Sequence, residues 1–209
     1  MGDEACSDCG EQPGAIRCLD CFGRRLLCKD CVVISHRHLP FHRIEAWNGN
    51  CFLPSSLVDQ GFILHVGHGG EPCPNAHRDA EWVDMDQGDD SAMDETIDVG
   101  PNADHKTSLL IVDTAGIFNH HVAWCRCVPD NKPDQAMVLF QHHLFPSSFI
   151  RPETAFTFNV LDDFYMESME CKTAAMSFYQ KLRRLTSNTF PGNVAVSDFI
   201  TSISVVLLK

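Results

Sequence analysis

The stretch 18-CLDCFGRRLLCKDC-31 decides how this chain can fold, because it contains two Cys-x-x-Cys pairs separated by six residues. A third pair lies upstream in 6-CSDC-9, and the histidine-rich segment 36-HRHLPFH-42 follows. A Cys-x-x-Cys turn directs two sulfur atoms at one tetrahedral ion, so each pair supplies half of a coordination shell. Four such pairs predict two zinc ions, held by the following residues: Cys6, Cys9, Cys18, Cys21, Cys28, Cys31, His36 and His42.

Thiolate and imidazole ligands in a tetrahedral set favour zinc over other metals. Because protein atoms fill all four positions, we expect structural ions with no open site for water. Spacing alone leaves the pairing open: consecutive pairs can share an ion, or the first can join the third and the second the fourth. The short link 22-FGRRLL-27 favours a strand or turn running between two ions.

Cysteine usage also bears on the compartment of the protein. The chain has 209 residues, eleven of them cysteines, and 44% are hydrophobic, which is normal for a packed core. Residues 1–11 are polar and acidic, unlike a signal peptide, and no run of about 18 apolar residues predicts a membrane span. We therefore expect an intracellular protein whose thiols stay reduced and bind metal instead of forming disulfides.

Acidic residues are concentrated in one segment. The formal net charge is −12, and residues 71–104 contain eleven acidic residues and one arginine. The remainder of the chain is therefore almost neutral. The acidic run predicts a solvated, disordered insert, with a docking segment for a basic partner as the alternative.

The sequence predicts an α+β fold in three parts. Residues 1–46 have the profile of a small zinc domain that metal holds together. Residues 47–190 form a second domain that contains a β-hairpin and C-terminal helices, interrupted by the acidic insert at about 75–105. Residues 191–209 form an atypical tail, for which a truncation or a frameshift would account.

Hydrophobic periodicity gives the expected elements of the second domain. They are a short strand at 62–66, hairpin strands at 108–113 and 117–125, a helix from Pro133 to about 144, and a helical region at 160–186 with a break near 170–172.

A third metal site is predicted from His68, Cys73, Cys125 and Cys127. Alternate residues of a strand share a face, so the two thiols of 124-WCRC-127 can reach one ion. The glycines around His68 let the backbone bend toward them. Such a site would tie the strand near 62–66 to the hairpin, whereas the alternative is a surface histidine and small buried thiols. Cys51 and Cys171 remain, and we expect them to be ordinary packing residues.

At 6–42 the order of the pairs, their spacing and the neighbouring apolar residues resemble a B-box-type zinc finger. The resemblance implies an interleaved cross-brace, with Cys6, Cys9, Cys28 and Cys31 on one zinc and Cys18, Cys21, His36 and His42 on the other. The last interval is longer than is usual in B-boxes, so His38 is an alternative ligand to His42.

Across residues 16–186 the chain resembles the CxC (type 2) cysteine cluster domain associated with KDZ transposases. The motifs that carry this resemblance are 17-RCLDCFGRRLLCKDC-31, 41-FHRIEAWNG-49, 65-HVGHGGEPCP-74, 110-LIVDTAGI-117, 124-WCRC-127 and 155-AFTFNVLDDFYMESMECKTAAMSFYQKLRRLT-186. The acidic stretch 77–104 is not part of the family pattern, and the tail departs from it.

The resemblance implies a non-catalytic zinc-binding module, stand-alone or truncated, that binds a protein partner or transposon DNA in the nucleus. The RNase H-like catalytic domain of full-length relatives is not expected in this chain. The alternative is the remnant of a transposase or nuclease whose catalytic domain is missing. We expect neither a membrane nor a nucleotide cofactor among its partners.

Two other signals are weaker. The segments 109-LLIVDTAG-116 and 131-NKPD-134 look like GTPase motifs, but no phosphate-binding loop accompanies them, and Asp113 is better explained as a turn residue. The carboxylates Asp163, Glu167 and Glu170 share a helix face, which most often means a solvated surface.

Overall fold

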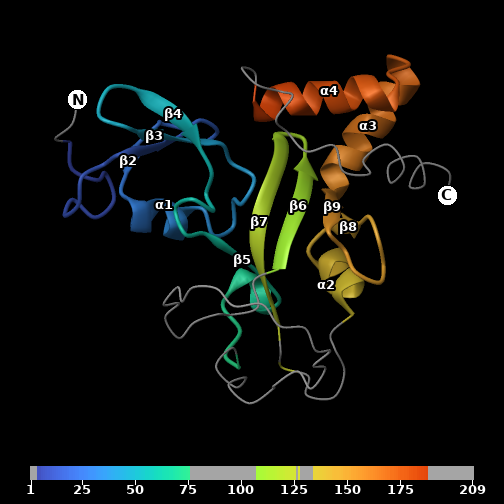
Figure 1. Ribbon diagram of the computed structural model, residues 1–209, viewed down its shortest axis with the longest axis horizontal. Coiled ribbons are helices and arrows are strands. Elements are labelled where there is room, and N and C mark those ends of the chain that lie inside the picture. Colours follow the sequence, from blue (N-terminus) through green and yellow to red (C-terminus); the bar gives the residue numbers. More distant parts are fainter. Residues whose placement is uncertain (1–3, 76–106, 126, 128–133, 188–209) are drawn as a thin grey trace, which may run out of the picture.

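The computed structural model describes residues 4–75, 107–125, 127 and 134–187. It mixes helices and strands as predicted, in two sheets that lie side by side (Figure 1). The N-terminal sheet forms one end of the molecule, and the helices of the C-terminal half lie at the other end (Figure 1). All but one residue of the expected insert at about 75–105, and the tail 191–209, lie outside the described residues.

The first sheet has four strands in the order β2-β1-β3-β4, and every pair is antiparallel. Its strands are β1 (Ile16–Cys18), β2 (Leu26–Leu27), β3 (Ile44–Trp47) and β4 (Phe52–Ser55). The sheet and the helix α1 (Lys29–Ser35), which shares its core, form what we call the first module. The sheet therefore runs past residue 46, where we placed the end of the first domain. The small core of this module includes Ile16, Leu27, Val32 and Ile44, all less than 5% exposed.

The second sheet has five strands in the order β5-β7-β6-β9-β8. They are β5 (Ile63–Val66), β6 (Thr107–Asp113), β7 (Gly116–Trp124), β8 (Leu144–Pro146) and β9 (Thr154–Thr157). Strands β6 and β7 form the predicted hairpin, whereas β5 pairs with β7 and β9 pairs with β6 in parallel. The sheet thus brings segments from both sides of the acidic insert together.

Asp113 builds the turn of the β6–β7 hairpin. One carboxylate oxygen accepts a hydrogen bond from the backbone N–H of Ala115 at 2.9 Å, and the other accepts one from the hydroxyl of Thr157 at 2.8 Å. Asp113 is 8% exposed. These bonds give Asp113 the role of a turn residue, as the sequence predicted.

The helices are α2 (Gln135–Gln141), α3 (Phe158–Glu170) and α4 (Ala175–Thr186), with the 3₁₀ turn η1 (His68–Gly70) after β5. The break expected in the last helical region falls between α3 and α4. Our helix end at about 144 was wrong: α2 ends at Gln141, because His143 has a left-handed φ of 57° and turns the chain into β8.

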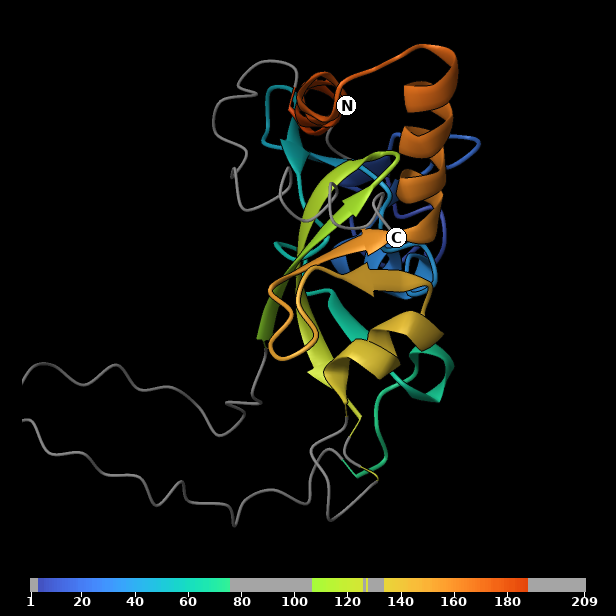
Figure 2. The ribbon, with the colours of Figure 1, turned by 90° about the vertical axis from the view of Figure 1, so that its right-hand side faces the viewer.

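Apolar side chains cover the second sheet on both faces, because alternate residues of β6 point in opposite directions. Leu109 and Ile111 pack with Leu139 of α2, while Val112 packs with Phe164 of α3 and with α4. Figure 2 shows α3 standing along one side of the sheet, and Figure 1 shows α4 running across its upper end.

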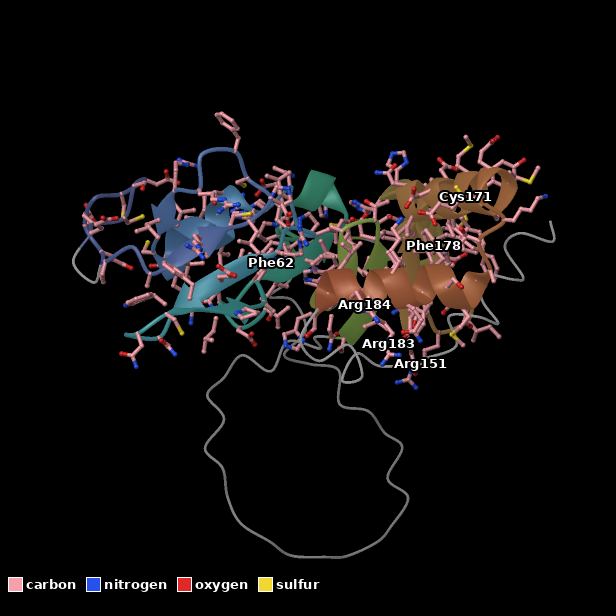
Figure 3. The ribbon with its side chains drawn as sticks, turned by 90° about the horizontal axis from the view of Figure 1, so that it is seen from above. Phe62, Arg151, Cys171, Phe178, Arg183 and Arg184 are labelled. Carbon is pink, nitrogen blue, oxygen red and sulfur yellow. The ribbon has the colours of Figure 1, made fainter. Side chains whose placement is uncertain are left out.

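Aromatic rings join the first module to the second sheet. His120 of β7 is 2% exposed, and its ring lies 5.5 Å from that of Phe62 and 6.0 Å from that of Phe41. Figure 3 shows Phe62 between the two sheets. A cavity of about 350 Å³ lies beside these rings, lined by residues of β3, β4, β7 and the end of α4. None of the helices in the described ranges is long and apolar enough to span a bilayer.

Candidate metal centres

The first group contains the sulfur atoms of Cys6, Cys9, Cys28 and Cys31, which all lie within 4.8 Å of one another. Cys6 and Cys9 come from the N-terminal loop, and Cys28 caps α1. The Cys28 sulfur accepts a hydrogen bond from the backbone N–H of Cys31 at 3.4 Å, and the Cys28 N–H donates to the Cys6 sulfur at 3.2 Å. The helix start therefore positions the third Cys-x-x-Cys pair against the first.

The backbone of this group favours thiolate at one position. Burial raises the pKa of the Cys6 thiol, but backbone N–H groups of Cys9, Asp8 and Cys28 outweigh burial and lower that pKa to about 6. The pKa of the Cys31 thiol is raised, first by its hydrogen bond with the Cys28 sulfur and then by burial. Neighbouring thiolates repel each other, so all four sulfurs can ionise together only around a cation.

The second group contains Cys18, Cys21, His36 and His42, whose ligand atoms also lie within 4.8 Å of one another. Cys18 ends β1, and His36 is the residue that caps the C-terminus of α1. The Nδ1 atom of His42 is 3.4 Å from the Cys18 sulfur and 3.3 Å from the Cys21 sulfur. The loop after β1, the end of α1 and the segment before β3 thus converge on one point.

His36 is oriented by the backbone of its own helix. It is 1% exposed, its Nδ1 atom lies 2.9 Å from the carbonyl oxygen of Val32, and its Nε2 atom lies 3.5 Å from the Cys21 sulfur. A proton on Nδ1 that is donated to this carbonyl leaves Nε2 free to bind a metal. The helix therefore selects the ring nitrogen that faces the thiols.

The ion pair between Arg43 and Asp20 holds the loop of the second group. Asp20 accepts a hydrogen bond from the Arg43 backbone N–H at 2.6 Å and pairs with its guanidinium at 2.5 Å. His38, the alternative ligand, lies outside the group; its exposed ring faces Gly70, where an added Cβ would lie 3.4 Å from two ring atoms. The geometry places His42, not His38, with the other three residues.

The third group contains His68, Cys73, Cys125 and Cys127. The Nε2 atom of His68 is 3.1 Å from the Cys125 sulfur and 3.2 Å from the Cys127 sulfur, and the Cys73 and Cys127 sulfurs are 3.6 Å apart. The hydrogen bond to Cys73, and then burial, raise the pKa of the Cys127 thiol to about 11. As in the first group, a cation would allow these thiols to ionise together.

Parallel pairing of β5 with β7 builds this third group. Val66 is paired with Trp124, so the residues that follow the two strands leave the sheet together. Strand β7 ends at Trp124, one residue before our prediction, so Cys125 and Cys127 lie beyond the strand and not on one of its faces. Gly67, with φ of 116°, passes so close to Cys125 that an added Cβ would lie 2.7 Å from the Cys125 Cβ.

Sequence reasoning missed two residues that support the third group. The Nε2 atom of His142, at the end of α2, accepts a hydrogen bond from the Gly67 N–H at 2.8 Å. The Asn75 side chain donates to the Cys127 sulfur at 3.4 Å. Asn75 directly follows the 73-CP-74 dipeptide, which is a weak local signal, but nothing in the sequence connects His142 with a loop so far away.

Cys51 and Cys171 were wrongly expected to be packing residues. Both are exposed and lie outside the three groups, Cys51 in the β3–β4 turn and Cys171 at the end of α3. The turn and the helix end present both side chains to solvent, so the eleven cysteines divide into nine that gather and two that do not.

Carboxylates of α3 form no comparable group. Lys181 of α4 lies 3.1 Å from the Asp163 carboxylate and 2.5 Å from that of Glu167. Among the described residues, the three groups that can hold a metal ion contain only cysteine and histidine. Asp163 and Glu167 therefore join α3 to α4 through Lys181.

Residues 96–190 match the family described as CxC2 like cysteine cluster associated with KDZ transposases. The match covers the hairpin, Cys125, Cys127 and the helices α2, α3 and α4, and it begins after His68 and Cys73. No curated protein and no solved structure gave a match. Over residues 96–190 the chain is thus similar to the CxC2 like cysteine cluster associated with KDZ transposases.

Proposed function

We propose that this chain is a non-catalytic zinc-binding module that works with a KDZ-type transposase by contacting a protein partner or transposon DNA. The observation that carries the proposal is the presence of three groups with four ligand atoms each. Four protein ligands complete a tetrahedral shell and leave no position for a water or a substrate, which a catalytic zinc requires. The ions would therefore stabilise the fold.

Zinc suits all three groups by its preference for sulfur and nitrogen ligands. One group has four cysteines, one has two cysteines and two histidines, and one has three cysteines and one histidine. The first two would form an interleaved cross-brace of the B-box type, since α1 begins next to one group and ends in the other. The third would hold the loops that follow β5 and β7.

Metal analysis of the purified full chain tests the proposal. We expect three zinc ions per chain by mass spectrometry of metal and sulfur, and the loss of one ion in each of the variants Cys28→Ser, Cys21→Ser and Cys127→Ser. Cys51→Ser and Cys171→Ser are matched controls that should keep all three, because these thiols lie outside the groups. Fewer than two ions per chain would contradict the proposal.

The alternative is a transposase or nuclease remnant with residual chemistry. The contacts of Asp163 and Glu167 with Lys181 favour a structural role for these carboxylates. We therefore expect no cleavage or strand transfer when the chain is incubated with transposon-end DNA and Mg²⁺ or Mn²⁺. Metal-dependent cleavage that Asp163→Asn abolishes would establish the alternative.

Charge pairing favours a protein partner for the first module. Four of its arginines are engaged with carboxylates, in the pairs Arg17–Glu45, Arg25–Asp8, Arg37–Glu71 and Arg43–Asp20. A phosphate backbone would have to compete with these carboxylates. Arg183 and Arg184, in the last turn of α4, are the better candidates for DNA contact.

DNA affinity measured across salt concentrations separates the two kinds of partner. Phosphate contacts release counterions, so specific DNA binding should weaken steeply with added salt. We expect weak DNA binding that Arg183→Ala/Arg184→Ala removes; tight binding that this double variant leaves unchanged would exclude these arginines. A nuclear location belongs to the proposal, and microscopy of a fluorescent fusion in the native cell tests it.

A further inference from the structure

Helix α3 carries apolar side chains on two sides. Val160 and Phe164 face the core and are 0% and 3% exposed. Tyr165, Met166 and Met169 lie on the other side and are 52%, 56% and 62% exposed. Residues spaced three and four apart are neighbours on a helix, so the exposed three form one continuous patch.

Acidic residues border this patch. The helix 158-FNVLDDFYMESME-170 contains four acidic residues and no lysine or arginine. Lys181 forms ion pairs with Asp163 and Glu167. Asp162 and Glu170 are exposed and form no ion pair with any described residue. Asp162 precedes Tyr165 and Met166 by three and four residues, and Glu170 follows Met166 by four, so both acids lie along the same stripe. We call these five residues the outer face of α3.

The basic residues of α4 do not neutralise the outer face. Figure 3 shows Cys171, which ends α3, on the opposite side of the molecule from Arg183 and Arg184. A surface that combines exposed apolar groups with one sign of charge selects a partner of the opposite charge.

Charge decides among the occupants of this face. A second copy that packs antiparallel on α3 would set Asp162 against Glu170, and a parallel copy would set each acid against itself, so self-association is repelled. Nucleic acid and anionic membranes are repelled for the same reason. A helix with leucine-type residues on one side and lysine or arginine at its borders matches both the apolar stripe and the carboxylates.

We propose that the outer face of α3 binds a basic amphipathic helix of a partner protein. Methionine side chains are flexible and polarizable, and they adapt to apolar residues of different shape. Carboxylates at both ends of the stripe attract the basic border of the partner and fix its position. The inference rests on the proposed function only in that it names the protein partner of the module, and it does not involve the metal groups.

A model peptide tests the inference on the full, zinc-loaded chain. The probe is a fluorescein-labelled helix of about 18 residues, with leucine at positions i, i+3, i+4 and i+7 and lysine elsewhere. Anisotropy titrations should show saturable binding that weakens between about 50 mM and about 300 mM salt, because charges contribute. Two control peptides should not bind. One has the same composition with leucine spread around the helix, and the other has glutamate in place of lysine.

Variants of the outer face locate the binding. Met166→Gln/Met169→Gln should raise the Kd for the peptide by at least about tenfold, which corresponds to about 1.4 kcal/mol of binding free energy. Asp162→Asn/Glu170→Gln should weaken it several-fold and flatten the salt dependence. Met137→Gln is the matched control, because Met137 is a 55% exposed methionine on α2; this variant should bind as the wild type does.

Other results overturn the inference. The inference is wrong if the wild-type chain does not bind the peptide, or if Met166→Gln/Met169→Gln binds it as tightly as the wild type. It is also wrong if Met137→Gln loses as much affinity for the peptide as Met166→Gln/Met169→Gln does. Sedimentation that shows a dimer abolished by Met166→Gln/Met169→Gln would assign the face to a second copy. Zinc content is measured in every sample. Three ions per chain without peptide binding reject the inference alone, whereas fewer than two ions per chain reject the proposed function.

Discussion

Gly67 and Cys125 approach each other so closely that no side chain fits between them. A Cβ atom on Gly67 would lie 2.7 Å from the Cys125 Cβ, and Gly67 has φ of 116°. The contact joins the end of β5 to the end of β7, and the residues that follow these strands supply the third group of ligands. The glycine is therefore required for this group of side chains to come together as a candidate metal site.

Gly67→Ala should remove the third ion and leave the other two in place. The new Cβ must displace Cys125, and the left-handed φ adds strain. Zinc counted per chain should fall from three to two, and Co²⁺ substitution should lose the absorption of one sulfur-rich site. Gly69→Ala is the control, since Gly69 also has a left-handed φ, of 66°, but nothing lies within 4 Å of its Cβ position.

Gly69→Ala should cost about 1 kcal/mol of stability through backbone strain while keeping three ions. If Gly67→Ala retained three ions with unchanged affinity, the close contact would not govern the metal site. If both variants lost the ion equally, strain alone would be the cause.

Replacement of His42 and of His38 should have opposite outcomes. His42→Ala removes the Nδ1 atom that lies 3.3 Å from the Cys21 sulfur, so the second ion should be lost and the first module should unfold more readily. His38→Ala should keep all ions, because its ring lies outside the group. The zinc content of both variants is measured by its release to a chromogenic chelator. If His38→Ala lost an ion, His38 would be a ligand after all.

Stability should fall in acid because of His120. Burial lowers the pKa of His120 from 6.5 to about 4, although the backbone of Pro40 favours the protonated ring. The unfolded chain binds this proton first, so the stabilising contribution is complete above about pH 6.5 and is lost as the pH falls toward 4. Between pH 7 and pH 5 the loss should be about 2 kcal/mol.

His120→Phe isolates this contribution from protonation of the metal ligands. Phenylalanine fits among the rings of Phe41, Phe62 and Phe118, so the variant should fold and lose less stability between pH 7 and pH 5. Urea unfolding at both pH values with excess zinc measures the difference. If both proteins lost the same free energy of unfolding between pH 7 and pH 5, His120 would be excluded as the origin of the pH dependence.

Asp113→Ala should destabilise the second sheet by roughly 1–3 kcal/mol, because Thr157 and the N–H of Ala115 lose their acceptor. Asp59→Ala, at an exposed carboxylate outside the hairpin, is the comparison and should cost less. Thermal unfolding measures both. If Asp113→Ala unfolded at the same temperature as the wild type, the structural role of Asp113 would be contradicted.

Much of the candidate site could be predicted from the sequence. The spacing in 18-CLDCFGRRLLCKDC-31 shows which cysteines form local pairs, because two residues between thiols fix a turn. The apolar segments on either side of the turn at residues 114–116 predicted the β6–β7 hairpin almost to the residue, since cross-strand neighbours in a hairpin are close in sequence. The twelve predicted ligands all fall into three groups.

Tertiary structure alone decided how distant segments meet. Spacing alone left the pairing of the first four ligand pairs open. The B-box resemblance implied the interleaved pairing with His42, and the grouping of these side chains in the structure agrees with it. The choice between His42 and the alternative His38 depends on how α1 packs. It did not predict that β5 lies parallel to β7, that His142 supports Gly67, or that Cys51 and Cys171 are exposed. Local spacing determines turns and strands through a few neighbouring dihedral angles, whereas burial and metal grouping depend on contacts between residues far apart in the chain.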